Sequence, residues 1–361
     1  MIVLALLGLV CAWILESTKV KQKTASYEVK KRAVELASQA YGTLRTYYTA
    51  DLGRRIDPDD DPAGTGLIGP RTSAITNARG NIAEKRTTLN PNLAAVIVDY
   101  LRQIGLKPGQ SVAVSTSGSF PGMNVDLYAA LEAMGLRPIV ITAVTSSSWG
   151  ATDPDFTWLD MERILAQRDI LHFRSAAATP GGSDDMGYTL SPDGKRMVRE
   201  AMKRNDVPEI QANSLEESIA QRMETYYGKA GAGKIAAYIN VGAVTASLGA
   251  SLEDVPLRSG LYFDLWKVNF PRDGTLVRFA KAGTPVIHLG AAQEIAREYG
   301  LAVAPRFMPE VGEGEALERQ GYNATVAIVL LVVYLGLILF LTMPELRRVL
   351  LRPNPAAESK G

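Results

Sequence analysis

The chain has 361 residues, with 39 Lys and Arg against 38 Asp and Glu and a formal net charge of +1. This balance, without runs of like charge, argues against a nucleic-acid partner, which normally meets a basic face. The two histidines, His172 and His288, are far apart and there is one cysteine, so no metal-ligand spacing and no internal disulfide are available. We expect no metal and no cofactor.

Both ends of the chain carry an uncharged apolar run. Residues 324–343 form a run of 20 residues, which as a helix spans roughly the 30 Å hydrocarbon core of a bilayer. A helix is required there because lipid offers no partners to backbone amides. Residues 1–15 are short for a span, but no small-residue cleavage site follows, so we expect an uncleaved N-terminal anchor. The lipid bilayer is therefore a predicted partner at both ends.

The basic residues beside the two runs disagree about topology. The tail 344–361 is basic, which places it in the cytoplasm and the central region outside. Three lysines at 19–23 follow the first run and argue for the opposite orientation. A basic leader upstream of residue 1 would reconcile the two, and we expect an extracytoplasmic domain on a two-span cell-membrane protein.

Apolar residues recur at helical spacing across residues 24–50, so we expect residues 16–50 to form a stem helix. Residues 51–92 are dense in Asp, Pro and Gly and read mostly as loop, and so long a loop is more often functional than not. This loop contains four cations: Arg71, Arg79, Lys85 and Arg86. They form either a solvated basic surface or a seat for the carboxylates of a polyanion, because Arg presents a planar fork of donors.

From residue 91 onward helices and strands alternate. The predicted strands are 111–115, 138–144, 234–241 and 284–289. The predicted helices are 91–104, 123–134, 160–167, 192–204, 214–227 and 291–299. This alternation predicts an open, mostly parallel, Rossmann-like α/β sheet within one globular domain, residues 51–320, flanked by an N-terminal and a C-terminal transmembrane helix.

Polar loops follow the predicted strands. Ligands of open parallel sheets bind at the carboxyl ends of the strands, and hydroxyls and glycines before a helix N-terminus suit an anion. Ordinary turn chemistry also accounts for any one of these loops. The candidate substrate-binding residues of the strand ends are Ser115, Ser117, Ser119, Asn124, Ser148, Trp149, Asp153, Asn240 and His288.

A serine hydrolase is an alternative interpretation. Ser117 or Ser119 would be the nucleophile, His288 the base, and Asp153 or Asp160 the group that orients the base. The sequence lacks the G-x-S-x-G elbow, because Ser119 directly follows a glycine.

A second alternative comes from the segment VAVSTSGSFPGMNVDLYAALEAMGLRPIVIT, residues 112–142. It resembles the phosphosugar-isomerase (SIS) motif of strand, serine-rich loop, helix and strand. The resemblance implies that Ser115, Ser117 and Ser119 hold a phosphate or a carboxylate. The Pro-Gly that follows the loop departs from that motif.

A broader resemblance rests on four segments: DPAGTGLIGPRTSAIT (61–76), GNIAEKRTTLNPNLAA (80–95), SGSFPGMN (117–124) and SSSWGATDPDFTWLDMERIL (146–165). Together they resemble the poly-gamma-glutamate system protein family. The resemblance implies a membrane anchor, an α/β domain and a C-terminal span. It also implies a role beside the ligase and the membrane subunits of the synthase that makes this capsule or released polymer. It supplies no catalytic residues.

Three functions follow as hypotheses. The first is an accessory membrane protein of poly-gamma-glutamate synthesis or export, which engages the polymer or the synthase subunits. The second is a hydrolase or transferase that processes or releases the polymer. The third is a scaffold that acts through its spans alone.

Overall fold

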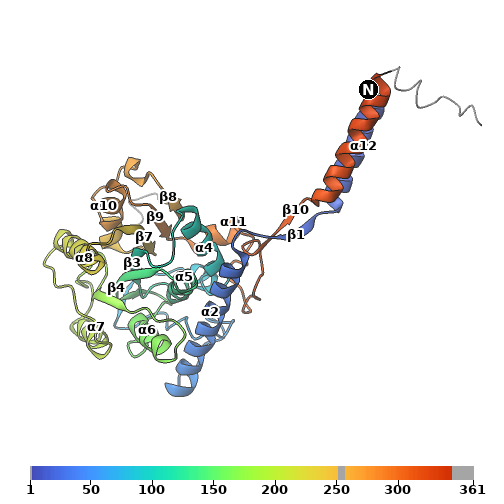
Figure 1. The fold of residues 1–361 in the computed structure, drawn as a ribbon. Helices are drawn as coiled ribbons and strands as arrows, with labels where there is room; N and C mark the ends of the chain where they lie inside the picture. Colours follow the sequence, from blue (N-terminus) through green and yellow to red (C-terminus); the bar gives the residue numbers. More distant parts are fainter. Residues whose placement is uncertain (1, 251–256, 344–361) are drawn as a thin grey trace, which may run out of the picture. The chain divides into compact units, whose positions relative to one another are not determined.

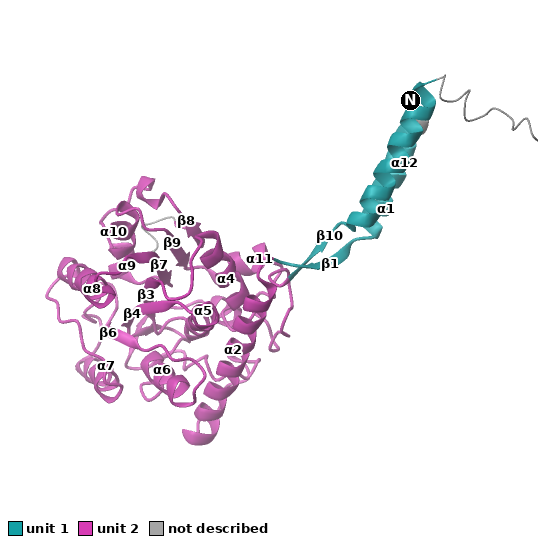
Figure 2. Cartoon of the chain, viewed as in Figure 1, with its two compact units in different colours: residues 1–24, 318–361 teal, residues 25–317 magenta. Residues whose placement is uncertain are grey.

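The computed structural model describes residues 2–250 and 257–343, which fall into two compact units (Figure 2). The larger unit comprises residues 25–317. The smaller unit combines the two ends of the chain, residues 1–24 and 318–361.

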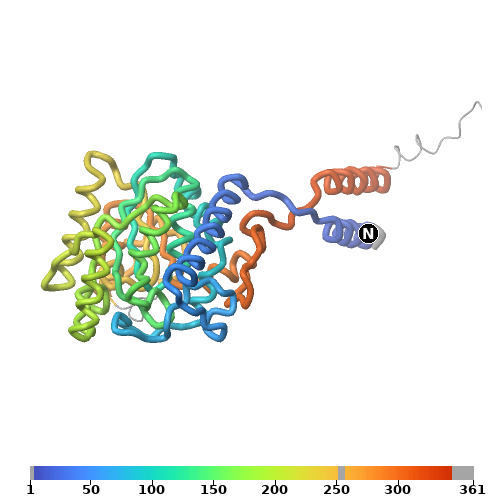
Figure 3. Tube along the Cα trace, turned by 90° about the horizontal axis from the view of Figure 1, so that it is seen from below, coloured from blue at the N-terminus to red at the C-terminus, as the bar shows by residue number. Residues whose placement is uncertain are grey.

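The smaller unit pairs the two chain ends. Its elements are α1 (Ile2–Ser17), β1 (Val20–Lys23), β10 (Glu318–Gly321) and α12 (Ala324–Thr342). β1 and β10 are antiparallel, with Val20 opposite Gly321. α1 and α12 lie side by side (Figures 1 and 3), and the Tyr334 hydroxyl donates to the Leu4 carbonyl at 3.3 Å.

Within the described residues, only α12 is long and apolar enough to cross a membrane. It has 19 residues, whereas α1 has 16 and is short for a span. The predicted C-terminal helix is therefore present, and the predicted N-terminal helix forms but does not reach the length of a span.

The larger unit is built on a six-stranded sheet, counted over the described residues, in the order β6-β4-β3-β7-β9-β8 (Figure 2). The strands are β3 (Ser111–Ser117), β4 (Arg137–Ala143), β6 (Ser175–Thr179), β7 (Ile235–Val241), β8 (Gly260–Tyr262) and β9 (Val286–Leu289). All pairings are parallel except that of β8 with β9. The prediction of a mostly parallel α/β sheet is confirmed, with β6 and β8 in addition to the four predicted strands.

The strand order reverses direction beside β3. The chain moves from β3 through β4 to β6 on one side, and continues from β7 to β9 on the other side. In register, Val114 of β3 lies between Val140 of β4 and Ile239 of β7. Open α/β sheets bind ligands outside the carboxyl ends of the strands at such a switch point.

Helices cover both faces of this sheet. The helices are α2 (Tyr27–Thr46), α4 (Leu93–Gln103), α5 (Pro121–Ala133), α6 (Trp158–Gln167), α7 (Pro192–Arg204), α8 (Leu215–Ala230), α9 (Thr245–Leu248), α10 (Thr275–Lys281) and α11 (Ala292–Glu298). Along β3, Val112 and Val114 join the core formed with α2, α4 and α5, whereas Ala113 joins the core formed with α8 and α10. The six predicted helices are present, with ends within three residues of those expected.

Helix α2 packs its apolar stripe into the larger unit. Ala33, Ala37, Tyr41 and Leu44 are buried at helical spacing. The Tyr41 hydroxyl donates to the Asp126 carboxylate at 2.9 Å. The prediction of one stem helix over residues 16–50 is therefore wrong, because the segment is divided between the two units and only α2, which packs one face on the core, forms a long helix.

The long loop after α2 packs against the segment that follows β4. It begins with a π-helical turn (Tyr47–Asp51) and contains β2 (Thr76–Ala78) and α3 (Ile82–Thr87). β2 pairs in parallel with β5 (Ser146–Ser147). Gly69 donates to the Gly150 carbonyl at 3.1 Å, and a Cβ on Gly69 would lie 2.4 Å from that oxygen. The loop therefore covers the carboxyl edge of the sheet, where the candidate site lies.

Candidate functional site

The loops that follow β3 and β7 meet at the switch point. The Ser119 amide donates to Ser117 Oγ at 3.3 Å, and Asn124 of α5 donates to the Ser117 carbonyl at 2.9 Å. Gly242, after β7, has φ +74°, and a Cβ there would lie 3.0 Å from the Phe120 ring. The structure thus brings together three of the predicted residues, Ser117, Ser119 and Asn124.

Ser115, Asn240 and His288 form a buried row across β3, β7 and β9. Asn240 donates from Nδ2 to the Gly242 carbonyl at 2.7 Å and to His288 Nδ1 at 3.0 Å. Because Nδ1 accepts, Nε2 carries the ring proton. Burial lowers the pKa of His288 to about 4, so the ring is neutral. His288 is therefore a hydrogen-bonded core residue at the strand ends.

The predicted hydrolase triad is not assembled. His288 contacts Asn240 instead of a carboxylate. Asp153 accepts from Arg54 Nε at 3.0 Å, and Asp160 accepts from Arg204 Nε at 2.8 Å. Each predicted orienting carboxylate is therefore engaged by an arginine.

Lys85 lies in the interior, although the sequence placed it on a basic surface or an anion seat. Only 2 % of the residue is exposed. Its Nζ donates to the Ser119 carbonyl and to Ser147 Oγ, the latter at 2.7 Å, and lies 4.1 Å from the centre of the Phe120 ring. Burial lowers the pKa of Lys85 to about 7, and the charge of Glu84 opposes this shift.

Trp149 lies in a second cluster of polar and charged residues at the carboxyl edge of the sheet. Its Nε1 donates to the Asp60 carboxylate at 2.9 Å, and the exposed Arg71 guanidinium lies 5.3 Å from the Trp149 ring centre. Arg86 Nε donates to the Asp60 carbonyl at 2.9 Å. Two of the four predicted cations thus share one cluster with Trp149.

The remaining predicted residues of this edge are Arg79 and Ser148. Arg79 is exposed directly after β2. Ser148 is buried, and its amide donates to the Ala78 carbonyl at 3.0 Å.

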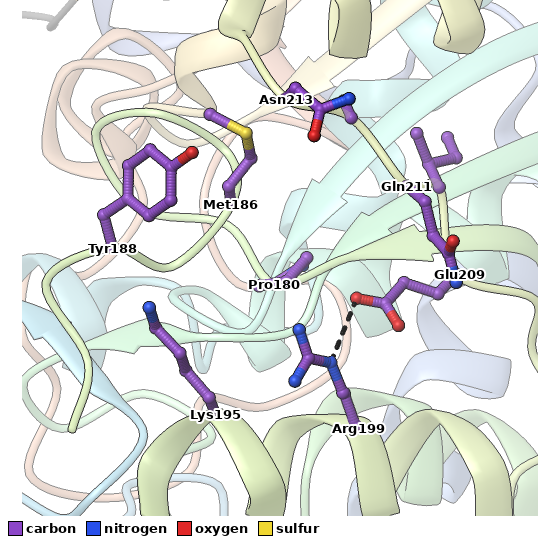
Figure 4. A pocket seen from close by; sticks show the side chains of 10 residues that line it. Pro180, Met186, Tyr188, Lys195, Arg199, Glu209, Gln211 and Asn213 are labelled. Atoms are coloured by element: carbon purple, nitrogen blue, oxygen red, sulfur yellow. Dashed lines mark ion pairs between the residues drawn. The ribbon is translucent and has the colours of Figure 1, made fainter. Parts of the chain in front are cut away.

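A groove of about 580 Å³ lies beside the carboxyl end of β6 (Figure 4). Lys195 and Arg199, one helical turn apart on α7, form one wall, and Figure 4 shows both side chains directed toward the space. Arg199 Nε lies 3.5 Å from Glu209 Oε1. The lining residues are Pro180, Met186, Tyr188, Lys195, Arg199, Glu209, Ile210, Gln211, Ala212 and Asn213.

A buried ion pair anchors the loop that carries Met186 and Tyr188. Asp185, with φ +65°, accepts from Arg222 Nε at 2.8 Å, and both side chains are at most 1 % exposed. The Asp184 carboxylate accepts from the Met186 amide at 2.7 Å and from the Tyr188 amide at 3.2 Å. A buried ion pair and hydrogen bonds to Asp184 therefore fix the loop that supplies two lining residues of the groove.

This groove was not predicted from the sequence. One signal was present, namely a lysine and an arginine four residues apart on a predicted helix, next to a stretch rich in Gly and Asp. Their convergence with residues 209–213 depends on the fold. Comparisons with family models, curated proteins and solved structures found no match.

Proposed function

We propose that this protein is a membrane-held accessory protein that binds a carboxylate-bearing polymer of the poly-gamma-glutamate type during its synthesis or export. The groove beside β6 carries this proposal. Its volume of about 580 Å³ lies in the range of ligand sites, and two cations line one wall.

The lining matches the chemistry of a γ-linked glutamyl chain. Each residue of that chain has a carboxylate, an amide and methylene groups. Lys195 and Arg199 suit the carboxylates, and Arg offers a planar fork of donors to them. The side-chain amides of Gln211 and Asn213 can donate to and accept from the chain amides. Tyr188 offers an apolar ring to the methylenes.

The membrane part of the proposal rests on α12. Its 19 residues give a helix of about 28 Å, close to the thickness of the hydrocarbon core. We infer that α12 spans the bilayer, that the shorter α1 inserts beside it, and that the larger unit lies outside the cytoplasm. The basic tail that favours this orientation lies outside the described residues.

Protease accessibility tests this orientation. Protease added to intact cells should digest residues 25–317. Digestion that occurs only after lysis would contradict an extracytoplasmic domain.

Binding of fluorescent poly-gamma-glutamate to the full protein in detergent, followed by anisotropy, tests the groove. We expect Lys195→Ala with Arg199→Ala to weaken binding at least about tenfold, the equivalent of 1.4 kcal/mol, because two carboxylate contacts are lost. Affinity should also fall with added salt, since exposed charges are screened. Glu209→Gln should strengthen binding, because its carboxylate repels the ligand.

The matched control removes the same charge from the same helix. Arg196 and Lys203 are exposed on α7 and do not line the groove. Arg196→Ala with Lys203→Ala should leave the affinity within about twofold, which is 0.4 kcal/mol. Equal losses in the two double variants, or no binding by the wild type, would reject the groove as the site.

A further inference from the structure

Lys85 of α3 meets Ser147 of β5, so that a lysine amine lies beside a serine hydroxyl. Lys85 Nζ lies 2.7 Å from Ser147 Oγ. Lys85 is buried, whereas Ser147 is half-buried. This pair lies apart from the groove, since neither residue lines it.

The surroundings of Lys85 suit a base. The hydrogen-bond partners of its Nζ are a backbone carbonyl and a serine hydroxyl, and neither is a carboxylate that would hold it as an ammonium ion. The carbonyl is that of Ser119, the face of the Phe120 ring lies beside the amine, and Glu84 is the charged side chain whose field acts on it. Burial lowers the pKa of Lys85 to about 7, so much of the amine is unprotonated at neutral pH.

The position of Ser147 is fixed from two sides. Its amide donates to Ser119 Oγ at 3.0 Å, and β5 pairs with β2, where Ser147 lies opposite Ala78. On the lysine side, a Cβ on Gly80 would lie 3.2 Å from Lys85 Cε, so the chain packs closely against the stem of Lys85. Both groups are thus held in place before any substrate binds.

We propose that Ser147 and Lys85 form an acyl-transfer dyad, with Ser147 as the nucleophile and Lys85 as its general base. Lys85 Nζ takes the hydroxyl proton while Oγ forms a bond to the carbonyl carbon of an amide or ester. The carbonyl π electrons move to oxygen and return as the bond to the leaving amine or alcohol breaks. Lys85 gives its proton to that leaving group. Water then attacks the acyl carbon while Lys85 takes one water proton. Lys85 returns this proton to Oγ as the bond between the acyl carbon and Oγ breaks, which releases the carboxylic acid and restores the serine hydroxyl.

The acyl donor that would follow is a γ-glutamyl amide of the bound chain, and this assignment alone rests on the proposed function. The dyad itself does not depend on the polymer.

A fluorescent fluorophosphonate tests the dyad on the full protein in detergent. Serine Oγ displaces fluoride from phosphorus, and peptide mass mapping locates the label. We expect one label on Ser147, at a rate that rises with pH with a midpoint near 7. Ser147→Ala should abolish labelling. Ser38→Ala, which removes a half-buried serine of α2, should leave the rate unchanged.

Two substitutions at Lys85 distinguish a general base from a lysine that only supports the structure. Lys85→Met should slow labelling at least about hundredfold, the lower end of the range for general base catalysis. Lys85→Arg keeps the charge but cannot act as a base near pH 7, so it should also lose labelling, and it decides the matter if Lys85→Met does not fold. An unlabelled Ser147 in the wild type, or a wild-type rate in either folded variant, would overturn the proposal.

The failure of this proposal can be told apart from the failure of polymer binding. Labelling at Ser147 without polymer binding supports the dyad and rejects the proposed function. Polymer binding without labelling rejects the dyad alone. If Ser147 is labelled by the probe but the unlabelled wild-type protein leaves the length of poly-gamma-glutamate unchanged in size-exclusion chromatography, the γ-glutamyl donor is rejected.

Discussion

The Asp185–Arg222 pair shows how a single buried contact shapes the candidate binding site. Asp185 adopts a backbone conformation with φ +65°, in a loop rich in glycine, and Arg222 of α8 holds its carboxylate. Removing one partner of a buried pair leaves an uncompensated charge, which costs about 3–5 kcal/mol. The groove therefore depends on a residue that does not line it.

We expect Arg222→Met to destabilise the full protein by about 3–5 kcal/mol, which lowers the Tm by roughly 10 °C. Thermal melting in detergent measures this change. Adding Asp185→Asn should restore part of the loss, because no unpaired charge is then buried and Asn tolerates a positive φ. An unchanged Tm in Arg222→Met would show that the pair contributes little.

At the scale of elements, the sequence predicted the parts of the fold that have a strong local signal. β4 and β7 are rich in branched apolar residues and lie between helices with a clear apolar period. β6 has the sequence SAAAT, whose small residues give little strand signal, and β8 has only three residues. β2 and α3 lie among residues that usually break structure, so the 51–92 region was predicted mostly as loop.

The candidate sites likewise contain some features that the sequence predicts and others that it does not. The strand ends of β3, β7 and β9 were predictable, because parallel strands must bring them to one edge. The burial of Lys85 was not, because it depends on contacts with residues more than 30 positions away. The groove also joins three separate segments, each of ordinary composition.

At the scale of the whole molecule, the two chain ends combine into one unit and the 25–317 region folds as another. The pairing of β1 with β10 and the contact of α1 with α12 join the ends without any residue of the larger unit. We propose that the first unit attaches the protein to the membrane and that the second unit binds the ligand. A binding domain held in this way would meet a polymer at the membrane where the polymer is made.

We propose that the groove recognises a γ-linked glutamyl chain and not merely negative charge. The most direct test measures the affinity of the full protein in lipid nanodiscs for γ-linked and α-linked polyglutamate of equal length. Both chains carry the same charge, but they differ in the spacing of carboxylates and amides. We expect the γ-linked chain to bind at least about tenfold more tightly, a difference of 1.4 kcal/mol in binding free energy. Equal affinities for the two chains would contradict it.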